Sequence, residues 1–190
     1  MGVVGNVFFY VLIGLLGLYL ASLWYSSKAL GRSWLYGLTA VAIFAIGRLM
    51  LPMPFVFQPR LEVSDLITNL AGFPILAAGL LLCVPAAFHI RPVTAPDKSE
   101  PLKTSGVYAI LRHPIVLGEI LWPLGLSLLM KSVIGISLTP FWFFCLYMIT
   151  RVEEEQMEAI FGDEYREYKR RVPGYIPFLK GLRTKDEKGG

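Results

Sequence analysis

A polar segment that could hold a ligand, G-V-Y-A-I-L-R-H-P at residues 106–114, stands directly before a long apolar run. Because proline is common in the first turn of a helix, we expect a helix to begin at Pro114. The unpaired N–H groups and positive dipole end of such a helix suit a carboxylate or a phosphate of a ligand. In the alternative interpretation, Arg112 and His113 only reach from the apolar run to the membrane surface.

A second candidate, R-V-E-E-E at residues 151–155, follows the last apolar run of the chain. On a helix, Arg151 lies one turn from both Glu154 and Glu155. Acids at this place could bind the cationic part of a ligand, or hold an arginine that orients a nucleophile. The alternative is an acidic first turn favoured by the helix dipole, but a helix that continues from the apolar run has no first turn here.

A third candidate, F-G-D-E-Y-R-E-Y-K-R-R-V-P at residues 161–173, places Tyr165 and Tyr168 on one helical face. Two aromatic rings with this spacing could form the wall of a site for a planar ring. More often, such a pair only docks an amphipathic helix onto its neighbours or onto lipid headgroups.

The elements that position these residues are transmembrane helices. The chain has 190 residues, of which 55% are hydrophobic, and this excludes an ordinary soluble domain. We predict an all-α integral membrane protein with about five transmembrane helices. Two of these spans form a helical hairpin at 115–150, which is interrupted by Lys131 and Ser132. A C-terminal helix that lies in the cytoplasm follows the hairpin. The predicted spans are Val7–Tyr25, Leu35–Phe57, Leu66–Phe88 and the two arms of Ile115–Thr150.

The chain divides into two parts that form one integrated unit. Residues 1–88 hold three N-terminal transmembrane helices, and we expect the first to be retained rather than cleaved as a signal peptide. Residues 89–190 hold a proline-rich loop (89–114), the hairpin and a soluble helix over Val152–Arg171 that continues from the last span. Residues 185–190 are predicted to be a disordered tail.

The basic residues predict the orientation of the chain. Most of the 18 Lys and Arg residues fall in segments on the same side as the C-terminus. This predicts a cytoplasmic C-terminus and an external N-terminus, in the cell membrane of a prokaryote or the endoplasmic reticulum of a eukaryote. The net charge of +4 therefore indicates contact with membrane lipids and not with nucleic acid. Cys83 and Cys145 lie in apolar runs without metal-type spacing, so no metal is expected.

Together the three candidate segments resemble the isoprenylcysteine carboxyl methyltransferase family and its phospholipid-methyltransferase-like relatives. That family shows G-x-Y-x-x-x-R-H-P-x-Y-x-G, a helical hairpin, R-x-x-E-E, F-G-x-x-Y-x-x-Y and a late proline. The resemblance covers about residues 102–180. The matching residues are Gly106, Tyr108, Arg112, His113, Pro114, Gly118, Arg151, Glu154, Glu155, Phe161, Gly162, Tyr165, Tyr168 and Pro177.

The resemblance implies that S-adenosylmethionine is the cofactor, held at the cytosolic edge of the membrane, and that a lipophilic methyl acceptor arrives from the bilayer. Catalytic roles are implied for Arg151, which would position an acceptor carboxylate, and for Glu154 or Glu155, which would fix that arginine or meet the ammonium of a ligand. The implied cofactor contacts are His113 and the N–H groups near Pro114 for the methionine end, Tyr108, Tyr165 and Tyr168 for the adenosine, and also Gly106, Arg112 and Gly118.

Two residues depart from the family pattern. Val116 stands where the family usually has a tyrosine. Glu119 is an ionisable residue about one turn into the membrane, and such residues are often functional. The run Leu117-Gly118-Glu119 that contains it resembles the sterol-reductase relatives of the family, which use NADPH.

Several alternatives therefore stay open. They are a phospholipid or thiol methyltransferase, an NADPH-dependent lipid reductase and a silent membrane scaffold. A Gly–Asn–Trp-type segment that the family carries is not evident ahead of residue 100. The sequence leaves the identity of the acceptor open, and it makes no prediction of the oligomeric state.

Overall fold

The computed structural model describes residues 6–26, 34–89 and 101–175. In these ranges the secondary structure is helical, and the one β-type contact is an isolated bridge between Arg60 and Ser132. The predicted all-α class is confirmed. The helices are α1 (Val7–Ser26), α2 (Trp34–Met50), α3 (Asp65–His89), the short 3₁₀ helix η3 (Gly106–Ala109), α4 (Pro114–Leu129), α5 (Val133–Ser137), α6 (Thr139–Phe161) and α7 (Asp163–Arg171).

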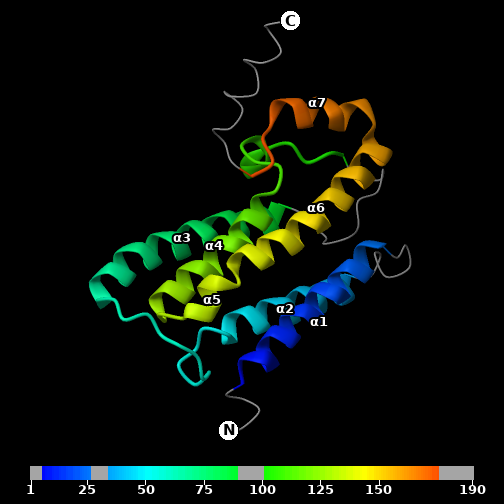
Figure 1. Ribbon diagram of the computed structural model, residues 1–190. Coiled ribbons are helices and arrows are strands. Elements are labelled where there is room, and N and C mark those ends of the chain that lie inside the picture. Colours follow the sequence, from blue (N-terminus) through cyan, green and yellow to red (C-terminus); the bar gives the residue numbers. More distant parts are fainter. Residues whose placement is uncertain (1–5, 27–33, 90–100, 176–190) are drawn as a thin grey trace, which may run out of the picture.

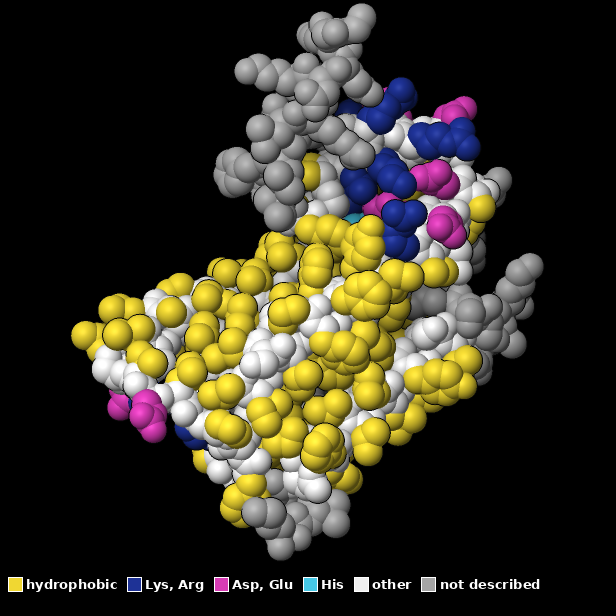
Figure 2. Space-filling view, viewed as in Figure 1, with side chains coloured by type: hydrophobic (Ala, Val, Ile, Leu, Met, Phe, Trp, Pro, Cys, Tyr) yellow, Lys and Arg dark blue, Asp and Glu magenta, His cyan; other side chains and the backbone are white. Residues whose placement is uncertain are grey.

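The helices form a bundle with an apolar outer surface, as expected of a multi-pass membrane protein. Among the residues that the structure describes, three helical stretches are long and apolar enough to cross a membrane: Val7–Trp24, Asp65–Ala86 and Val133–Phe161. The helices at Leu35–Met50 and Pro114–Leu129 are apolar but shorter, so the number of five spans stays a prediction. Hydrophobic side chains cover the bundle in Figure 2, while Lys, Arg, Asp and Glu gather mainly at the end that carries α7.

Close backbone contacts join the helices in pairs, α1 with α2 and α3 with α4 (Figure 1). A side chain at Gly47 on α2 would collide with the backbone of Gly14 on α1, at 2.4 Å. Between α3 and α4, a Cβ at Gly118 would lie 2.5 Å from Cys83 Sγ and 2.7 Å from the Gly79 oxygen. Small residues at such contacts allow helices in a membrane to approach closely and gain van der Waals packing.

Three predicted helix boundaries were wrong. The second span ends at Met50 and not at Phe57, because the apolar run beyond it contains Pro52 and Pro54 and turns. The second arm of the hairpin is divided at Leu138 into α5 and α6. The helix predicted over Val152–Arg171 is also divided, because Gly162 has a φ of +59°, which favours glycine and ends α6. The chain turns there, and α7 runs across the end of the bundle (Figure 1).

At the other end of the bundle, Arg60 ties the loop after α2 to the turn between α4 and α5. Its guanidinium donates to the backbone oxygens of Pro52 (2.7 Å), Met130 (2.8 Å), Met53 (2.7 Å) and Val56 (3.1 Å). The connections after α2 and α4 therefore lie together, at the end opposite α7 (Figure 1). This is the arrangement that successive antiparallel spans require.

Candidate functional site

The polar site lies where three separate parts of the chain meet at the α7 end of the bundle. The loop that follows η3 joins the segment after α7 by backbone hydrogen bonds. The Arg112 nitrogen donates to the Pro173 oxygen at 2.9 Å, and the His113 nitrogen donates to the Gly174 oxygen at 3.1 Å. The chain needs both the turn at Gly162 and the whole of α7 to bring residues 173–174 back to this loop.

Glu154 on α6 is the centre of this site. Its Oε1 accepts from Arg112 Nε (3.1 Å) and Nη2 (2.7 Å), and it lies 2.8 Å from His113 Nε2. Its other oxygen, Oε2, lies 2.9 Å from Lys169 Nζ on α7. Although Glu154 is buried, its carboxylate is surrounded by positive groups that favour the charged form. One side chain therefore links α6 to the loop before α4 and to α7.

Arg112 also closes the end of α7. Its Nη1 donates to the backbone oxygens of Lys169 (3.1 Å) and Val172. The last carbonyls of a helix have no partners within the helix, so a guanidinium at this place both satisfies them and meets the negative end of the dipole. Arg112 is thus fully engaged in holding the site together.

His113 connects Glu154 to a second acid and to an aromatic cluster. Its Nδ1 lies 4.0 Å from Glu153 Oε2, and its ring stacks on Tyr175 with centroids 5.2 Å apart and planes at 28°. The Tyr175 hydroxyl pairs with the hydroxyl of Thr150, which is buried on α6. Among the described residues, no Lys or Arg forms an ion pair with Glu153, unlike its neighbour Glu154.

The tyrosines predicted to line an adenosine lie in a packed cluster. Tyr165 and Tyr168 are each 3% exposed and pack with Leu102 and Val172. The Tyr168 hydroxyl donates to the backbone oxygen of Tyr108 at 2.7 Å. Burial raises the pKa of Tyr168 to about 12 and also raises the pKa of Tyr165, so both phenols stay neutral. The hydrogen bond of Tyr168 joins α7 to η3, and the role of the two rings toward an adenosine stays a prediction.

Arg151 lies apart from Glu154, on a different face of α6. Its side chain is exposed, and its Nη1 lies 3.5 Å from the Tyr147 hydroxyl one turn earlier. Tyr147 in turn stacks on Phe143, with centroids 6.4 Å apart. Glu155 is also exposed. Of the two acids expected to fix Arg151 or to meet a ligand, Glu154 instead binds Arg112 and His113, which the loop brings to its carboxylate.

The remaining predicted residues shape the backbone. Gly106 has a φ of +61° and begins η3, and Pro114 is the buried first residue of α4. Gly118 lies against Cys83 and Gly79 on α3, where only a glycine fits. Val116 packs against the apolar cluster that contains Trp142. Pro177 and the tail at residues 185–190 lie outside the described residues.

Two residues that join these groups were missed from the sequence, and a third was not separated from its neighbours. Lys169 and Tyr175 carried no motif signal, and Glu153 could not be told apart from its two acidic neighbours. Arg48 pairs with Glu119 at 2.8 Å, between Nη1 and Oε2. The signal for this pair was that Arg48 and Glu119 each place a charge within an apolar run, where a charged residue usually has a partner.

Fold and site define a multi-pass helical membrane protein with a polar site at one end of its bundle. Comparisons with known proteins give its family. The model of the phospholipid methyltransferase family matches residues 72–164. Protein-S-isoprenylcysteine O-methyltransferase of Homo sapiens is 35% identical over 140 residues, which cover 68% of this chain and 48% of that protein. The enzyme of Xenopus laevis is 35% identical over 128 residues, which cover 65% and 43%.

The chain belongs to the family of isoprenylcysteine carboxyl methyltransferases and their phospholipid-methyltransferase-like relatives. It spans about half the length of the curated relatives it matches. A solved structure, that of the eukaryotic intramembrane Ras methyltransferase ICMT without a monobody, matches with 19% identity and a TM-score of 0.41. The match covers 90% of this chain and 75% of that one.

Proposed function

We propose that this protein is a membrane methyltransferase that uses S-adenosylmethionine and methylates a lipophilic acceptor, the carboxylate of a prenylcysteine, at the cytoplasmic membrane face. The observation that carries this proposal is the meeting of all three motif segments at Glu154, through Arg112, His113 and Lys169. Curated relatives that are 35% identical are named as methyltransferases of isoprenylcysteine. The end of the bundle that carries α7 is the cytoplasmic one in this proposal, as the distribution of basic residues predicts.

The charges of the site fit S-adenosylmethionine. Its sulfonium and ammonium groups are cationic, and the Glu153 carboxylate faces His113 without an Arg or Lys partner among the described residues. Glu153, His113 and the N–H groups at the start of α4 would hold the methionine end, with Tyr108 toward the adenosine. When bound, the cofactor supplies an electrophilic methyl group. The protein then has to align the acceptor and exclude water, with little covalent help.

The acceptor side of the site is the exposed face of α6. Phe143, Tyr147 and Arg151 follow one another at intervals of one turn, and they lead from the apolar part of α6 to a cation at its polar end. An amphiphile with an apolar chain and a carboxylate head matches this order. Arg151 would hold the carboxylate by a charge-assisted hydrogen bond.

A phospholipid acceptor is the second candidate, because the family model that matches residues 72–164 is described as phospholipid methyltransferase. NADPH chemistry has less support, since Glu119, the residue that suggested it, forms an ion pair with Arg48.

The test is binding followed by transfer. We expect the purified protein in lipid nanodiscs to bind S-adenosylmethionine and S-adenosylhomocysteine in calorimetry, and NADPH not at all. It should then transfer a radiolabelled methyl group to a farnesylated cysteine analogue, and not to phosphatidylethanolamine. Transfer to phosphatidylethanolamine alone would select the second candidate. Absence of binding by either adenosyl ligand overturns the proposal.

A further inference from the structure

Arg48 is a charged residue enclosed within the apolar part of the bundle. It lies near the end of α2 and is 3% exposed. Its Nη1 donates to Glu119 Oε2 at 2.8 Å, and its Nη2 donates to the backbone oxygen of Glu119. The guanidinium also lies over the rings of Phe44, at 4.6 Å from the centroid, and Trp122, at 5.6 Å. These contacts offset part of the cost of holding an arginine away from water.

One donor of this guanidinium is not satisfied by the protein. Among the residues that the structure describes, none accepts a hydrogen bond from Arg48 Nε, and that atom is buried. A buried donor without a partner destabilises the folded protein, and it does so more strongly when the group is charged. In a bilayer core, bulk water cannot supply the missing acceptor.

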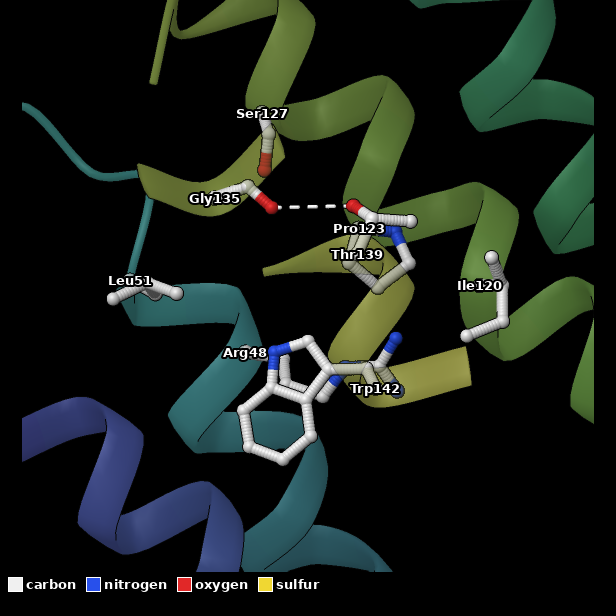
Figure 3. A pocket seen from close by; sticks show the side chains of 8 residues that line it. All are labelled: Arg48, Leu51, Ile120, Pro123, Ser127, Gly135, Thr139 and Trp142. Atoms are coloured by element: carbon white, nitrogen blue, oxygen red, sulfur yellow. Dashed lines mark hydrogen bonds between the residues drawn. The ribbon is translucent and has the colours of Figure 1, made fainter. Parts of the chain in front are cut away.

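A small cavity adjoins Arg48 and contains hydroxyl groups (Figure 3). It offers about 10 Å³ of space to a water-sized molecule, and Ser127 on α4 and Thr139 at the start of α6 contribute to its wall. Ser127 is 2% exposed, and the Thr139 hydroxyl donates to the Gly135 oxygen at 3.2 Å, which leaves its lone pairs as acceptors. The rest of the lining consists of Leu51, Ile120, Pro123, Gly135 and Trp142.

We infer that this cavity is a binding site for one buried water molecule, which accepts a hydrogen bond from Arg48 Nε and meets the hydroxyls of Ser127 and Thr139. The volume is about that of one water, and a buried water commonly makes about three hydrogen bonds to polar groups that otherwise lack them. An organic ligand or a hydrated ion is too large for this space. A cavity lined only by apolar side chains would stay dry, but this one contains a charged donor.

The water completes a polar junction between the two parts of the bundle. Arg48 belongs to α2, Glu119 and Ser127 belong to α4, and Thr139 begins α6. The α1–α2 hairpin is thereby joined to the helices that carry the candidate site. This inference concerns the packing of the bundle and does not depend on the proposed enzymatic activity.

Hydroxyl-radical footprinting tests the inference directly. The whole 190-residue chain in nanodiscs is irradiated in ¹⁸O-labelled water, which generates radicals at bound waters, and mass spectrometry measures the oxidation of individual side chains. Trp142, which lines the cavity, should be oxidised several times faster than Trp24, which does not. The two tryptophans are buried alike, at 4% and 3% exposure. Equal rates for the two would overturn the inference.

A matched pair of variants tests the polar wall. Thr139→Val keeps the shape of the cavity but removes a hydroxyl, and it should lower the oxidation of Trp142 several-fold. Thr39→Val removes the hydroxyl of another helical threonine, one that donates to the Leu35 oxygen at 2.8 Å and is exposed on α2. It should leave the oxidation of Trp142 unchanged. If both variants lower it equally, or neither does, the cavity does not hold the water by these contacts.

Discussion

Arg112 and Glu154 are 42 positions apart in the sequence, yet two nitrogens of the Arg112 guanidinium donate to the same Glu154 oxygen, at 3.1 and 2.7 Å. The contact joins the loop before α4 to the polar end of α6. Because Arg112 also donates to the last carbonyls of α7, a single ion pair holds three segments in place.

Glu154→Gln should weaken both folding and activity. The change leaves Arg112 and Lys169 without their common counter-ion in a largely buried place. Removing one partner of a buried pair costs about 3–5 kcal/mol of unfolding free energy. Thermal unfolding and methyl transfer should both show the loss. The control is Glu158→Gln, which removes a more exposed partner of Lys169 and should cost less than about 1 kcal/mol. Equal losses in the two variants would contradict the central role of Glu154.

Arg151→Ala should lower activity while the protein stays folded. Arg151 is exposed and contacts the Tyr147 hydroxyl at 3.5 Å, so little stability depends on it. Loss of a charge-assisted hydrogen bond to the acceptor should reduce kcat/KM by about 10- to 100-fold. Steady-state kinetics at saturating S-adenosylmethionine measures this. Arg166→Ala, which removes an exposed arginine that pairs with Asp163, should change neither quantity. Unchanged kinetics for Arg151→Ala would place the acceptor elsewhere.

Arg48→Met and Glu119→Met should each destabilise the bundle, and the two together should not. Either single change strands a charge in the membrane, with a cost of about 3–5 kcal/mol by analogy with buried pairs in soluble proteins. The double variant removes both charges, so its melting temperature should be close to that of the unchanged protein. A double-mutant cycle by thermal unfolding measures the coupling. If the two losses simply add, the ion pair does not join the helices.

Gly118→Ala should destabilise the contact between α3 and α4. The new Cβ would lie 2.5 Å from Cys83 Sγ, 2.7 Å from the Gly79 oxygen and 2.9 Å from the Cys83 nitrogen, so the helices must separate. Overpacking of this kind costs about 1–3 kcal/mol. Gly174→Ala is the control, because its Cβ would meet Arg112 Nη2 at an ordinary 3.5 Å. Equal melting temperatures for the two variants would show that α3 and α4 can adjust without cost.

The sequence predicted the apolar helices well, since length and hydropathy decide which segments can lie in a bilayer. It failed at their ends. The run to Phe57 is apolar enough to extend α2, but Pro52 and Pro54 end the helix first, and Gly162 divides a helix whose polarity shows no break. Local backbone geometry decides these boundaries, and a hydropathy average over a window of residues does not report it.

The site was predicted in pieces. Arg112, His113 and Glu154 were each singled out, but the protein partner considered for Glu154 or Glu155 was Arg151, their neighbour on the same helix. The actual contacts depend on how α7 turns back over the loop, which spacing along one helix cannot reveal. Arg48 and Glu119 are a similar case, because the two are separated by 71 positions and meet only through the packing of α2 against α4.

The backbone bonds between residues 112–113 and residues 173–174 also determine the order in which the molecule can be assembled. The ribosome makes the loop before α4 well ahead of the segment that holds it. All the apolar helices can therefore enter the membrane while this loop still lacks its partners. The polar site is completed last, after α7 has left the ribosome, so the newly inserted protein passes through a stage in which Glu154 lacks Lys169 and the loop lacks its backbone partners.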